Sequence, residues 1–168
     1  MGYDLSVLVA AYNKADHLVR NLQSLAHQTL DHATWEVLVL DDGSTDETAQ
    51  VVKEAQAQVD YRLRYLYLPR EDYSTAAVPL NVGIKRAEAP IIVQANADVI
   101  LARDALALFK LYSETSDGNQ FIFGQAYRVH SPMTQALLDH LSWHEDIHCL
   151  ETILVTPYHH AGYWRVPM

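Results

Sequence analysis

Short apolar runs recur along the first 110 residues of the chain, and polar residues bound each of them. A nearly continuous apolar run of this length is typical of a β-strand buried on both faces of a parallel sheet. Such runs predict buried strands at Leu5–Ala11, Glu36–Leu40 and Ile91–Ala95, and Leu63–Leu68 indicates a further strand.

The stretches between these runs repeat apolar residues every three or four positions, which is the pattern of a helix with one buried face. One stripe comprises Leu18, Leu22 and Leu25, and a second comprises Ala49, Val52, Ala55 and Val59. Pro79 suits the first turn of a helix that runs towards Ala87. A further helix is expected over Leu106–Tyr112.

Polar residues mark the expected starts of the first two helices. Asn13, with Asp16 three residues later, is expected to cap the first helix, and Ser44 with Glu47 matches a capping box for the second. After the fourth helix the expected elements are an extended Phe121–Val129, a helix from Ser131 to about His148, and β-prone pieces at Ile153–Thr156 and Tyr163–Val166.

Strands and helices that alternate in this way predict an α/β fold with a mostly parallel sheet and helices on both faces. Ligands of such sheets lie beyond the carboxyl ends of the strands. Three polar clusters directly follow a predicted strand and become candidate sites: Ala10–Asn13, Asp41–Ser44 and Asn96–Asp98.

The composition fits one compact domain over residues 1–168, because 49% of the 168 residues are apolar. The formal net charge of −9 argues against nucleic acid and against an anionic membrane surface as partners. A single cysteine, Cys149, favours a reducing compartment. The longest apolar stretches, such as Leu101–Leu108, are too short for a transmembrane segment, and no secretory signal is recognised.

These features together favour a cytoplasmic protein. Met1, Gly2 and Ser6 match the loose N-myristoylation pattern. A plain lead-in to the first strand accounts for the same residues and is the preferred interpretation.

The adjacent carboxylates of Asp41 and Asp42 need compensation, because like charges raise each other's pKa. A following helix N-terminus can stabilise one of them. The other then needs a ligand, a metal or water, so both helix capping and ligand contact remain open for this pair. Asn96 and Asp98, one residue apart in extended chain, would point the same way and offer the oxygen ligands that Mg²⁺ or Mn²⁺ prefers. A cap or a turn is the alternative for these two.

Five segments, in this order along the chain, resemble family 2 glycosyltransferases, which have the GT-A fold. They are Ser6–Asn13, Leu25–Leu30, Trp35–Asp46, Leu80–Ile84 with Ala87, and Ile91–Asp98. The resemblance covers roughly residues 5–110. It implies a domain that binds a nucleotide sugar, and although no single segment is decisive, their occurrence in register makes the resemblance specific.

By this resemblance the nucleotide-binding residues are Ala10, Tyr12, Asp42, Asn81 and Asn96, and the metal ligand is Asp98. Ala10 and Tyr12 would contact the base, and Asp42 would bond its ring nitrogen edge. Asn96 would bond a ribose hydroxyl, while Asp98 would hold Mn²⁺ or Mg²⁺ on the diphosphate.

Two residues depart from the family pattern. Asn96 stands where the family's Asp-x-Asp signature begins with Asp, which removes a charge near the metal. Leu80 stands where many members have Arg, and Lys85, Arg86 or Arg70 could supply the phosphate contact instead, with surface solvation as the alternative.

The base that deprotonates the acceptor is usually an Asp of an acidic pair in this family. Asp146 of the Glu145–Asp146 pair is the candidate here. The alternative is that the base lies outside the chain, because Gly162–Val166 looks like the strand that precedes the family's Gly-Gly-Phe-Asp-like segment. Nine histidines occur, and His140, His144 and His148 have a zinc-compatible spacing, but a partly buried helix face is the preferred interpretation. His159 and His160 could supply a late metal ligand.

The hypothesis is transfer of a sugar from a nucleoside-diphosphate sugar, with UDP-sugar favoured, to an acceptor hydroxyl with divalent-metal assistance and inversion. The acceptor would be a carbohydrate, a lipid-linked molecule or a protein, and a peripheral association with a membrane through the acceptor stays open. One alternative is a catalytically degenerate nucleotide-sugar-binding or interaction domain. A phosphoryl-receiver domain is disfavoured because its acidic pair should follow the first strand, and no Gly-x-Gly-x-x-Gly indicates a dinucleotide enzyme.

Overall fold

In the part of the chain that the computed structural model describes, four parallel strands form a sheet: β1 (Leu5–Ala11), β2 (Trp35–Asp41), β3 (Arg62–Tyr67) and β4 (Ile91–Asn96). Their order across the sheet is β3-β2-β1-β4. In the register Leu5 lies opposite Trp35 on one side and opposite Ile91 on the other. The structure describes residues 2–70, 75, 77–115, 121, 122 and 124. The chain divides into two compact units, Met1–Ser116 and Asp117–Met168, and all of these elements belong to the first.

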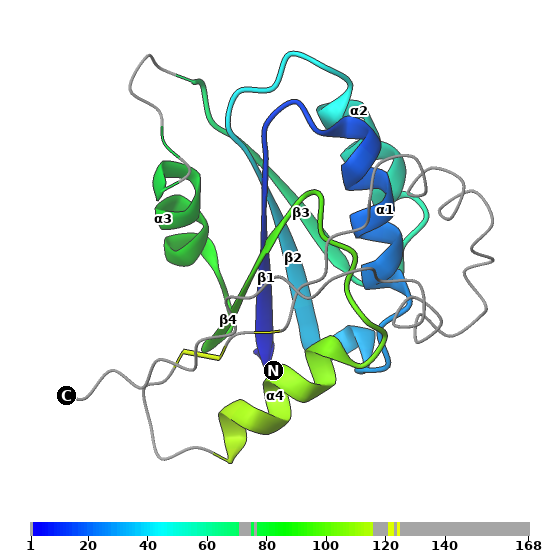
Figure 1. Cartoon of the computed structure of the whole chain (residues 1–168), viewed down its shortest axis with the longest axis vertical. Helices are drawn as coiled ribbons and strands as arrows, with labels where there is room; N and C mark the ends of the chain where they lie inside the picture. Colours follow the sequence, from blue (N-terminus) through cyan, green and yellow to red (C-terminus); the bar gives the residue numbers. More distant parts are fainter. Residues whose placement is uncertain (1, 71–74, 76, 116–120, 123, 125–168) are drawn as a thin grey trace, which may run out of the picture. The chain divides into compact units, whose positions relative to one another are not determined.

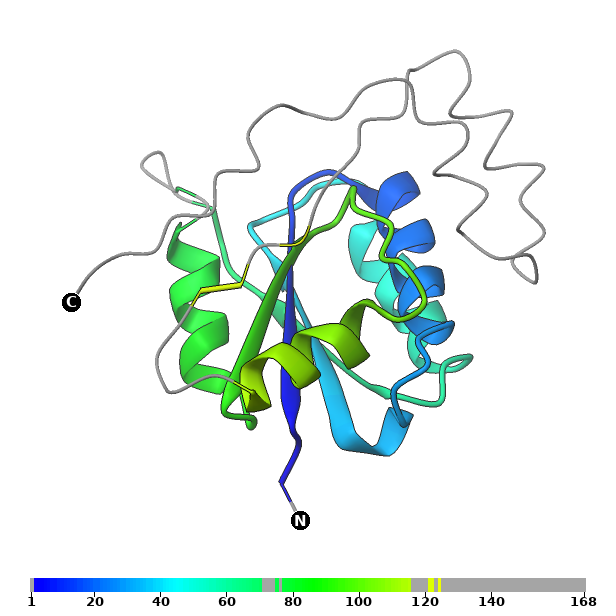
Figure 2. The same ribbon diagram turned by 60° about the horizontal axis from the view of Figure 1, so that its bottom comes forward.

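Helices cover both faces of this sheet, as the alternation of elements predicts. They are α1 (Ala15–Ala26), α2 (Thr48–Gln56), α3 (Ala77–Arg86) and α4 (Ala105–Glu114), with a short 3₁₀ turn at His32–Thr34. Figure 1 shows α1 and α2 on one side of the strands and α3 on the other. In Figure 2, α4 runs across the strands rather than along them.

Side chains that alternate along the strands build two hydrophobic clusters. On the face covered by α1 and α2, Val7 and Val9 pack with the α1 stripe of Leu18, Leu22 and Leu25. On the opposite face a smaller cluster of Leu8, Leu38 and Leu40 packs against Leu80 of α3. Because successive strand residues point to opposite faces, a strand with both faces covered is apolar at nearly every position.

Gly83 allows α3 to approach the sheet closely. A Cβ atom at this position would lie 2.5 Å from Leu40 Cδ1 and 3.2 Å from Leu8 Cδ1. A larger residue would therefore have to displace leucines that are already buried.

A buried carboxylate ties the end of α3 to the end of the sheet where the strands begin. Glu36 is fully buried, and its Oε1 accepts hydrogen bonds from Ser6 Oγ and from the backbone N–H of Glu88, both at 2.8 Å. Arg64 Nη1 donates to Glu36 Oε2 at 2.9 Å. Burial alone would raise the pKa of Glu36, but these hydrogen bonds and the Arg64 charge together hold that pKa below its ordinary value.

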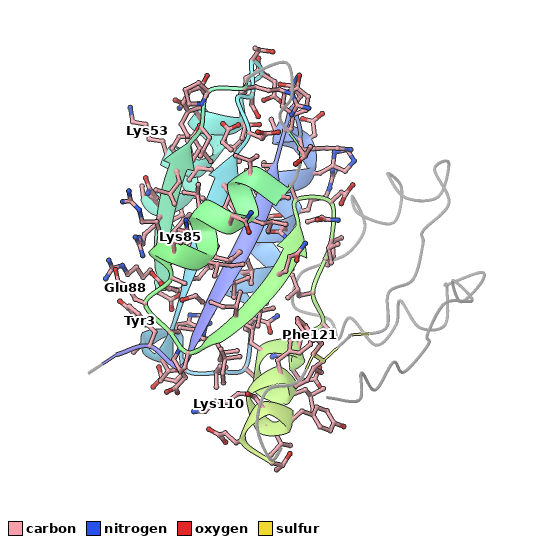
Figure 3. The ribbon with its side chains drawn as sticks, turned by 90° about the vertical axis from the view of Figure 1, so that its left-hand side faces the viewer. Tyr3, Lys53, Lys85, Glu88, Lys110 and Phe121 are labelled. Carbon is pink, nitrogen blue, oxygen red and sulfur yellow. The ribbon has the colours of Figure 1, made fainter. Side chains whose placement is uncertain are left out.

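The same end of the unit carries an exposed network around this carboxylate. Figure 3 shows Tyr3 and Glu88 there, and Arg62 donates to both, at 3.3 Å to Tyr3 Oη and 3.1 Å to Glu88 Oε1. The polar groups at this end satisfy one another, which leaves the opposite end of the strands as the candidate for ligand binding.

The predicted strands and helices are confirmed with boundaries shifted by a few residues, but two predictions of burial are wrong. Ile92 of β4 is 37% exposed and Gln94 is exposed, because β4 is an edge strand of the described sheet. Ala49 of α2 is also exposed, whereas Thr48 is buried in its place. The elements expected after α4 lie outside the described residues, apart from isolated positions near Phe121.

None of the helices in the described part of the chain is long and apolar enough to cross a membrane.

Candidate functional site

The carboxyl ends of the strands, at the upper end of the sheet in Figure 1, bring the three predicted polar clusters together. The strand order reverses at β1, because β2 and β3 lie on one side of it and β4 on the other. The backbone ladder continues just past the strands: Asp42 N donates to Ala11 O at 2.9 Å, and Ala97 N donates to Ala10 O at 3.2 Å. The end of β1 therefore has Asp42 on one side and the Asn96–Asp98 segment on the other, which is where ligands of open α/β sheets bind.

A pocket of about 280 Å³ lies at this point, close to the lower end of the range for small-molecule sites. Its lining is contributed by the ends of β1, β2 and β4, by the segment after β3 and by the start of α3. The lining residues are Ala10, Ala11, Tyr12, Lys14, Asp42, Arg70, Pro79, Asn96, Ala97 and Asp98. Five of the seven predicted site residues are therefore brought to one cavity by the fold: Ala10, Tyr12, Asp42, Asn96 and Asp98.

Asp42, Arg70 and Tyr12 form the first wall of this pocket. Arg70 Nη1 donates to Asp42 Oδ2, and the Arg70 guanidinium lies over the Tyr12 ring with 4.0 Å between Cζ and the ring centroid. Asp42 is only 6% exposed, so its charge needs the partner that Arg70 provides. An aromatic ring, a carboxylate and a planar cation can together bind a flat heterocycle by stacking and by hydrogen bonds along its edge.

Asp41 is held by hydrogen bonds from Ser44 and Tyr65 rather than by a helix N-terminus. Its Oδ1 accepts from Ser44 N at 2.8 Å, and its Oδ2 accepts from Tyr65 Oη at 2.5 Å. Burial and the bond to Asp41 both raise the pKa of the Tyr65 hydroxyl, so Tyr65 remains a donor. The expectation that a helix N-terminus stabilises one of these carboxylates is wrong, because α2 begins only at Thr48.

The two predicted helix caps are wrong as well, and the residues instead join two loops. Ser44 Oγ accepts from Asn13 N at 2.9 Å, and Asn13 Oδ1 accepts from Thr45 N at 2.8 Å. Asn13 has a φ of 50°, a left-handed conformation that Asn tolerates. The reciprocal bonds fix the loop after β1 against the loop after β2, and so they place Tyr12 beside Asp42.

Asp46 stabilises the starts of both helices in place of the predicted caps. Its Oδ2 accepts from Ala15 N at 3.0 Å, at the start of α1, and its Oδ1 accepts from Thr48 N at 3.1 Å, at the start of α2. A side chain that accepts from the first backbone N–H groups of a helix acts as a cap. For α1, this side chain belongs to Asp46, which lies in the loop after β2 and not next to α1 in the sequence.

Asn96 and Asp98 form the second wall of the pocket, with Asn96 at the end of β4 and Asp98 in the turn that the sequence left open as the alternative. Val99 N donates to Asn96 O at 3.1 Å, which closes a turn over Asn96–Val99 directly after β4. Asp98 is half-exposed and lies 3.6 Å from Lys14 Nζ. Both side chains line the pocket despite the turn.

The side chains at this wall could hold a divalent ion that is also bound by the phosphates of a nucleotide, but not an ion bound by protein ligands alone. No cluster of three or more His, Cys, Asp or Glu side chains with metal-binding geometry occurs within the described residues. Mg²⁺ and Mn²⁺ on a nucleotide commonly use one or two carboxylates together with phosphate oxygens and water. The accessible carboxylate of Asp98 meets that requirement.

Asn81 and the proposed substitutes for the missing arginine are only partly brought to the pocket. Asn81 is exposed on α3 and does not line the pocket, and Leu80 packs into the small hydrophobic cluster. Arg70 lines the pocket. Lys85 and Arg86 lie in the last turn of α3, where Arg86 O accepts from Arg64 at the opposite end of the sheet.

Sequence reasoning missed Lys14 altogether and gave Arg70 only as a substitute phosphate contact. Each lies three residues past the end of a strand, so the rule that ligands bind beyond the carboxyl ends of the strands is the signal that could have included them. The remaining candidates lie outside the described residues and stay predictions: Asp146, Cys149, His140, His144, His148, His159 and His160.

A parallel α/β sheet with a polar pocket where its strand order reverses is the arrangement in which open α/β proteins bind their ligands. The glycosyl transferase family 2 profile matches residues 6–162. The chain belongs to glycosyl transferase family 2, and its fold is GT-A.

Two curated relatives illustrate the similarity. Validoxylamine A glucosyltransferase of Streptomyces hygroscopicus subsp. jinggangensis is 39% identical over 97 residues, which is 57% of this chain and 22% of that protein. Poly(ribitol-phosphate) β-N-acetylglucosaminyltransferase TarS of Staphylococcus aureus is 30% identical over 101 residues, which is 60% of this chain and 17% of that protein. The chain thus spans well under half the length of these relatives.

Solved structures show the same fold. The S. aureus TarS fragment 1–349 in complex with UDP-GlcNAc has a TM-score of 0.55 and 28% identity, over 66% of this chain and 30% of that one. The mannosyltransferase PcManGT from Pyrobaculum calidifontis, in complex with GDP-Man and Mn²⁺, has a TM-score of 0.59 and 23% identity, over 82% and 39% of the two chains. These matches lend no support to a phosphoryl-receiver or a degenerate domain.

Proposed function

We propose that this protein transfers a sugar from a nucleoside-diphosphate sugar, with a UDP-sugar favoured, to an acceptor hydroxyl. The observation that carries the proposal is the convergence of Tyr12 and Asp42 on one wall of a single pocket with Asn96 and Asp98 on the other. The first pair suits a base and the second suits a ribose and a metal-bound diphosphate. A nucleotide that crosses the end of β1 would reach both walls.

The base would stack on the Tyr12 ring and bond to Asp42, next to the backbone of Ala10. A carboxylate accepts from the ring N–H of uracil, and this pairing favours UDP over nucleotides that present only acceptors there. The TarS fragment, 28% identical to this chain, binds UDP-GlcNAc, which supports the same choice. Arg70 would complete the site by fixing the Asp42 carboxylate and adding donors for the base.

The diphosphate would lie near Asp98 and Lys14. A divalent ion, Mn²⁺ or Mg²⁺, would supply charge neutralisation for the departing nucleoside diphosphate. Asp98 would hold that ion and Asn96 would bond the ribose. Because Lys14 lies 3.6 Å from Asp98, it would contact a phosphate oxygen once the carboxylate turns to the ion. Asn81 is exposed on α3 and does not line the pocket, so it would contact the part of the nucleotide that extends beyond the pocket.

The acceptor hydroxyl would attack the anomeric carbon from the side opposite the diphosphate, which gives inversion. A base must take the proton from this hydroxyl, and Asp146 is the proposed group. The acceptor would be a carbohydrate, a lipid-linked molecule or a protein, and a lipid-linked acceptor would bring the enzyme to a membrane surface.

Calorimetric titration with UDP, with and without Mn²⁺, tests the proposal. We expect UDP to bind more tightly with Mn²⁺ present, Asp42→Ala to weaken binding in both conditions, and Asp98→Ala to abolish only the gain from Mn²⁺. Asp16→Ala is the matched control, since Asp16 is an exposed aspartate of α1 that does not line the pocket. Absence of UDP binding in both conditions would refute the assignment of the site.

A further inference from the structure

Three buried polar side chains interrupt the apolar face of α1 and of the turn that follows it. Asn21, Ser24 and Gln28 are each at most 6% exposed and recur at helical spacing on the same side as Leu18 and Leu25. Buried polar groups are costly unless they are hydrogen-bonded. Their partners therefore show what this stripe does.

All three bond to the backbone of the segment that follows β4. Asn21 Nδ2 donates to Val99 O at 2.7 Å, Ser24 Oγ accepts from Leu101 N at 3.1 Å, and Gln28 Nε2 donates to Ala102 O at 2.7 Å. Gln28 Oε1 also accepts from Leu106 N at 3.0 Å, at the start of α4. The stripe thus fixes the chain from the pocket wall to α4 against one rigid helix.

Asn21 is the member of the stripe that reaches the turn carrying Asn96 and Asp98. Its Nδ2 also approaches Asn96 O at 3.4 Å, so one amide group spans both ends of the turn that Val99 N closes on Asn96 O. Ser24 and Gln28 bond residues further along the chain, beyond Asp98. The three side chains are alike in burial and in type of bond, but they differ in their distance from the pocket.

The nitrogen of the Asn21 side-chain amide makes hydrogen bonds, whereas its oxygen makes none within the described residues. Asn21 Oδ1 is buried and has no hydrogen-bond partner within the described part of the chain. A buried acceptor without a partner is unfavourable, so the contribution of Asn21 to this structure comes from the bonds that Nδ2 donates. Those bonds hold the turn and nothing else in the described residues.

We propose that Asn21 is a positioning residue that holds the Asn96–Val99 turn so that Asp98 and Asn96 face the pocket. The inference rests on the proposed function for the metal role of Asp98. The need for a tether follows from the fold, because the turn follows an edge strand and its outer side is exposed. Small displacements of a ligating group cost a large part of its effect, since binding depends on geometry held by supporting residues.

Asn21→Leu removes both donated bonds and the unpartnered oxygen while it keeps the side-chain volume nearly constant. We expect this variant to bind UDP without metal within about threefold of the unaltered protein, because Tyr12 and Asp42 are untouched and only the ribose contact of Asn96 is disturbed. It should lose about fivefold or more of the Mn²⁺-dependent gain, which depends on Asp98. Gln28→Leu is the matched control, since it removes bonds from the same stripe to the same segment. Gln28→Leu should leave the Mn²⁺-dependent gain unchanged, even if it lowers the unfolding midpoint more than Asn21→Leu does.

Hydrogen exchange of the backbone amides separates failure of this inference from failure of the proposed function. We expect the Val99 amide to exchange about tenfold faster in Asn21→Leu than in Gln28→Leu, whether or not nucleotide binds. An unchanged Val99 exchange rate, or an undiminished Mn²⁺-dependent gain in Asn21→Leu, would overturn the positioning role. If the unaltered protein binds no UDP, the proposed function fails, and the exchange rates alone then decide whether Asn21 holds the turn.

Discussion

The guanidinium of Arg70 stacks on the ring of Tyr12, with 4.0 Å between Arg70 Cζ and the ring centroid, while its Nη1 donates to Asp42. One side chain from the segment after β3 thus contacts both predicted base-binding residues. Asp42 is nearly buried, so the bond from Arg70 gives its carboxylate a charged partner and holds it in one orientation. Tyr12, which is 43% exposed, gains a flat neighbour that keeps its ring against the pocket.

Arg70→Ala should therefore weaken UDP binding although Arg70 was expected only as a phosphate contact. Loss of one charge-assisted hydrogen bond, which leaves Asp42 unpaired, corresponds to about 1.5–3 kcal/mol, or at least roughly tenfold in the dissociation constant. Arg70→Lys should recover part of the loss, because Lys keeps the charge but lacks the planar group that stacks on Tyr12. UDP binding to Arg70→Ala as tight as to the unaltered protein would show that Arg70 takes no part in nucleotide binding.

The adjacent aspartates should separate into a stability residue and a binding residue. Asp41→Asn exchanges one acceptor of two buried bonds for a donor, so it should lower the free energy of unfolding by about 1–3 kcal/mol. UDP affinity should change little, because Asp41 lies outside the pocket lining. Asp42→Asn should show the reverse, with a clear loss of UDP affinity and a smaller loss of stability. Urea unfolding and calorimetry on the two variants provide the measurement, and equal effects of both on affinity would contradict the division.

Gly43 should tolerate no side chain, for a reason that involves Arg70. Its φ is 77°, and a Cβ atom there would lie 2.6 Å from Arg70 Cβ and 2.7 Å from Arg70 N. We expect Gly43→Ala to destabilise the fold by more than about 2 kcal/mol, because two costs combine. Alanine is unfavourable in the left-handed conformation, and its Cβ atom would clash with the backbone of Arg70. Thermal unfolding measures this loss.

Gly43→Asn tests which of the two costs dominates. Asn tolerates the left-handed conformation but keeps the Cβ atom, so it should be about as unstable as Gly43→Ala. A stable Gly43→Asn would mean that backbone conformation, rather than contact with Arg70, requires the glycine.

Glu36 should make stability depend on acidic pH. Its pKa in the folded protein is lowered from the ordinary value of 4.5, so the unfolded state binds more protons in this range. The stabilisation is therefore present above the ordinary value and is lost as the pH falls through the lowered pKa. Glu36→Gln should be less stable at neutral pH by about 1–3 kcal/mol, because it loses its charged bond to Arg64.

The same variant should also lose stability less steeply as the pH falls from about 5 towards 3, because Gln has no proton to bind. Urea unfolding at a series of pH values checks both effects. Ser6→Ala provides a control that removes one hydrogen bond from Glu36 while it keeps the titrating carboxylate. Parallel pH profiles for Glu36→Gln and the unaltered protein would contradict the role of this carboxylate.

The sequence by itself determined the strands, the helices and the edge of the sheet where the site lies. A strand that is buried on both faces appears in the sequence as a continuous apolar run, as in Leu5–Ala11. A helix with one buried face repeats apolar residues every three or four positions, as in Leu18, Leu22 and Leu25. Parallel strands have their carboxyl ends on the same side of the sheet, so the sequence predicts that the polar residues after them lie close together even though it gives no distances. Asp42 and Asp98 line one pocket, as this rule and the resemblance to a family led us to expect, while their roles in binding stay predictions.

Only the tertiary structure decided what the individual polar residues bond to. Ser44 bonds Asn13 instead of capping a helix, Asp41 bonds Tyr65, and Arg70 pairs with Asp42 across 28 positions. Such partners come from distant segments, and local spacing carries no information about them. Asn21 shows the same limit, because its place in an apolar stripe is visible in the sequence, while its bond to Val99, 78 positions away, exists only once α1 packs beside the end of β4.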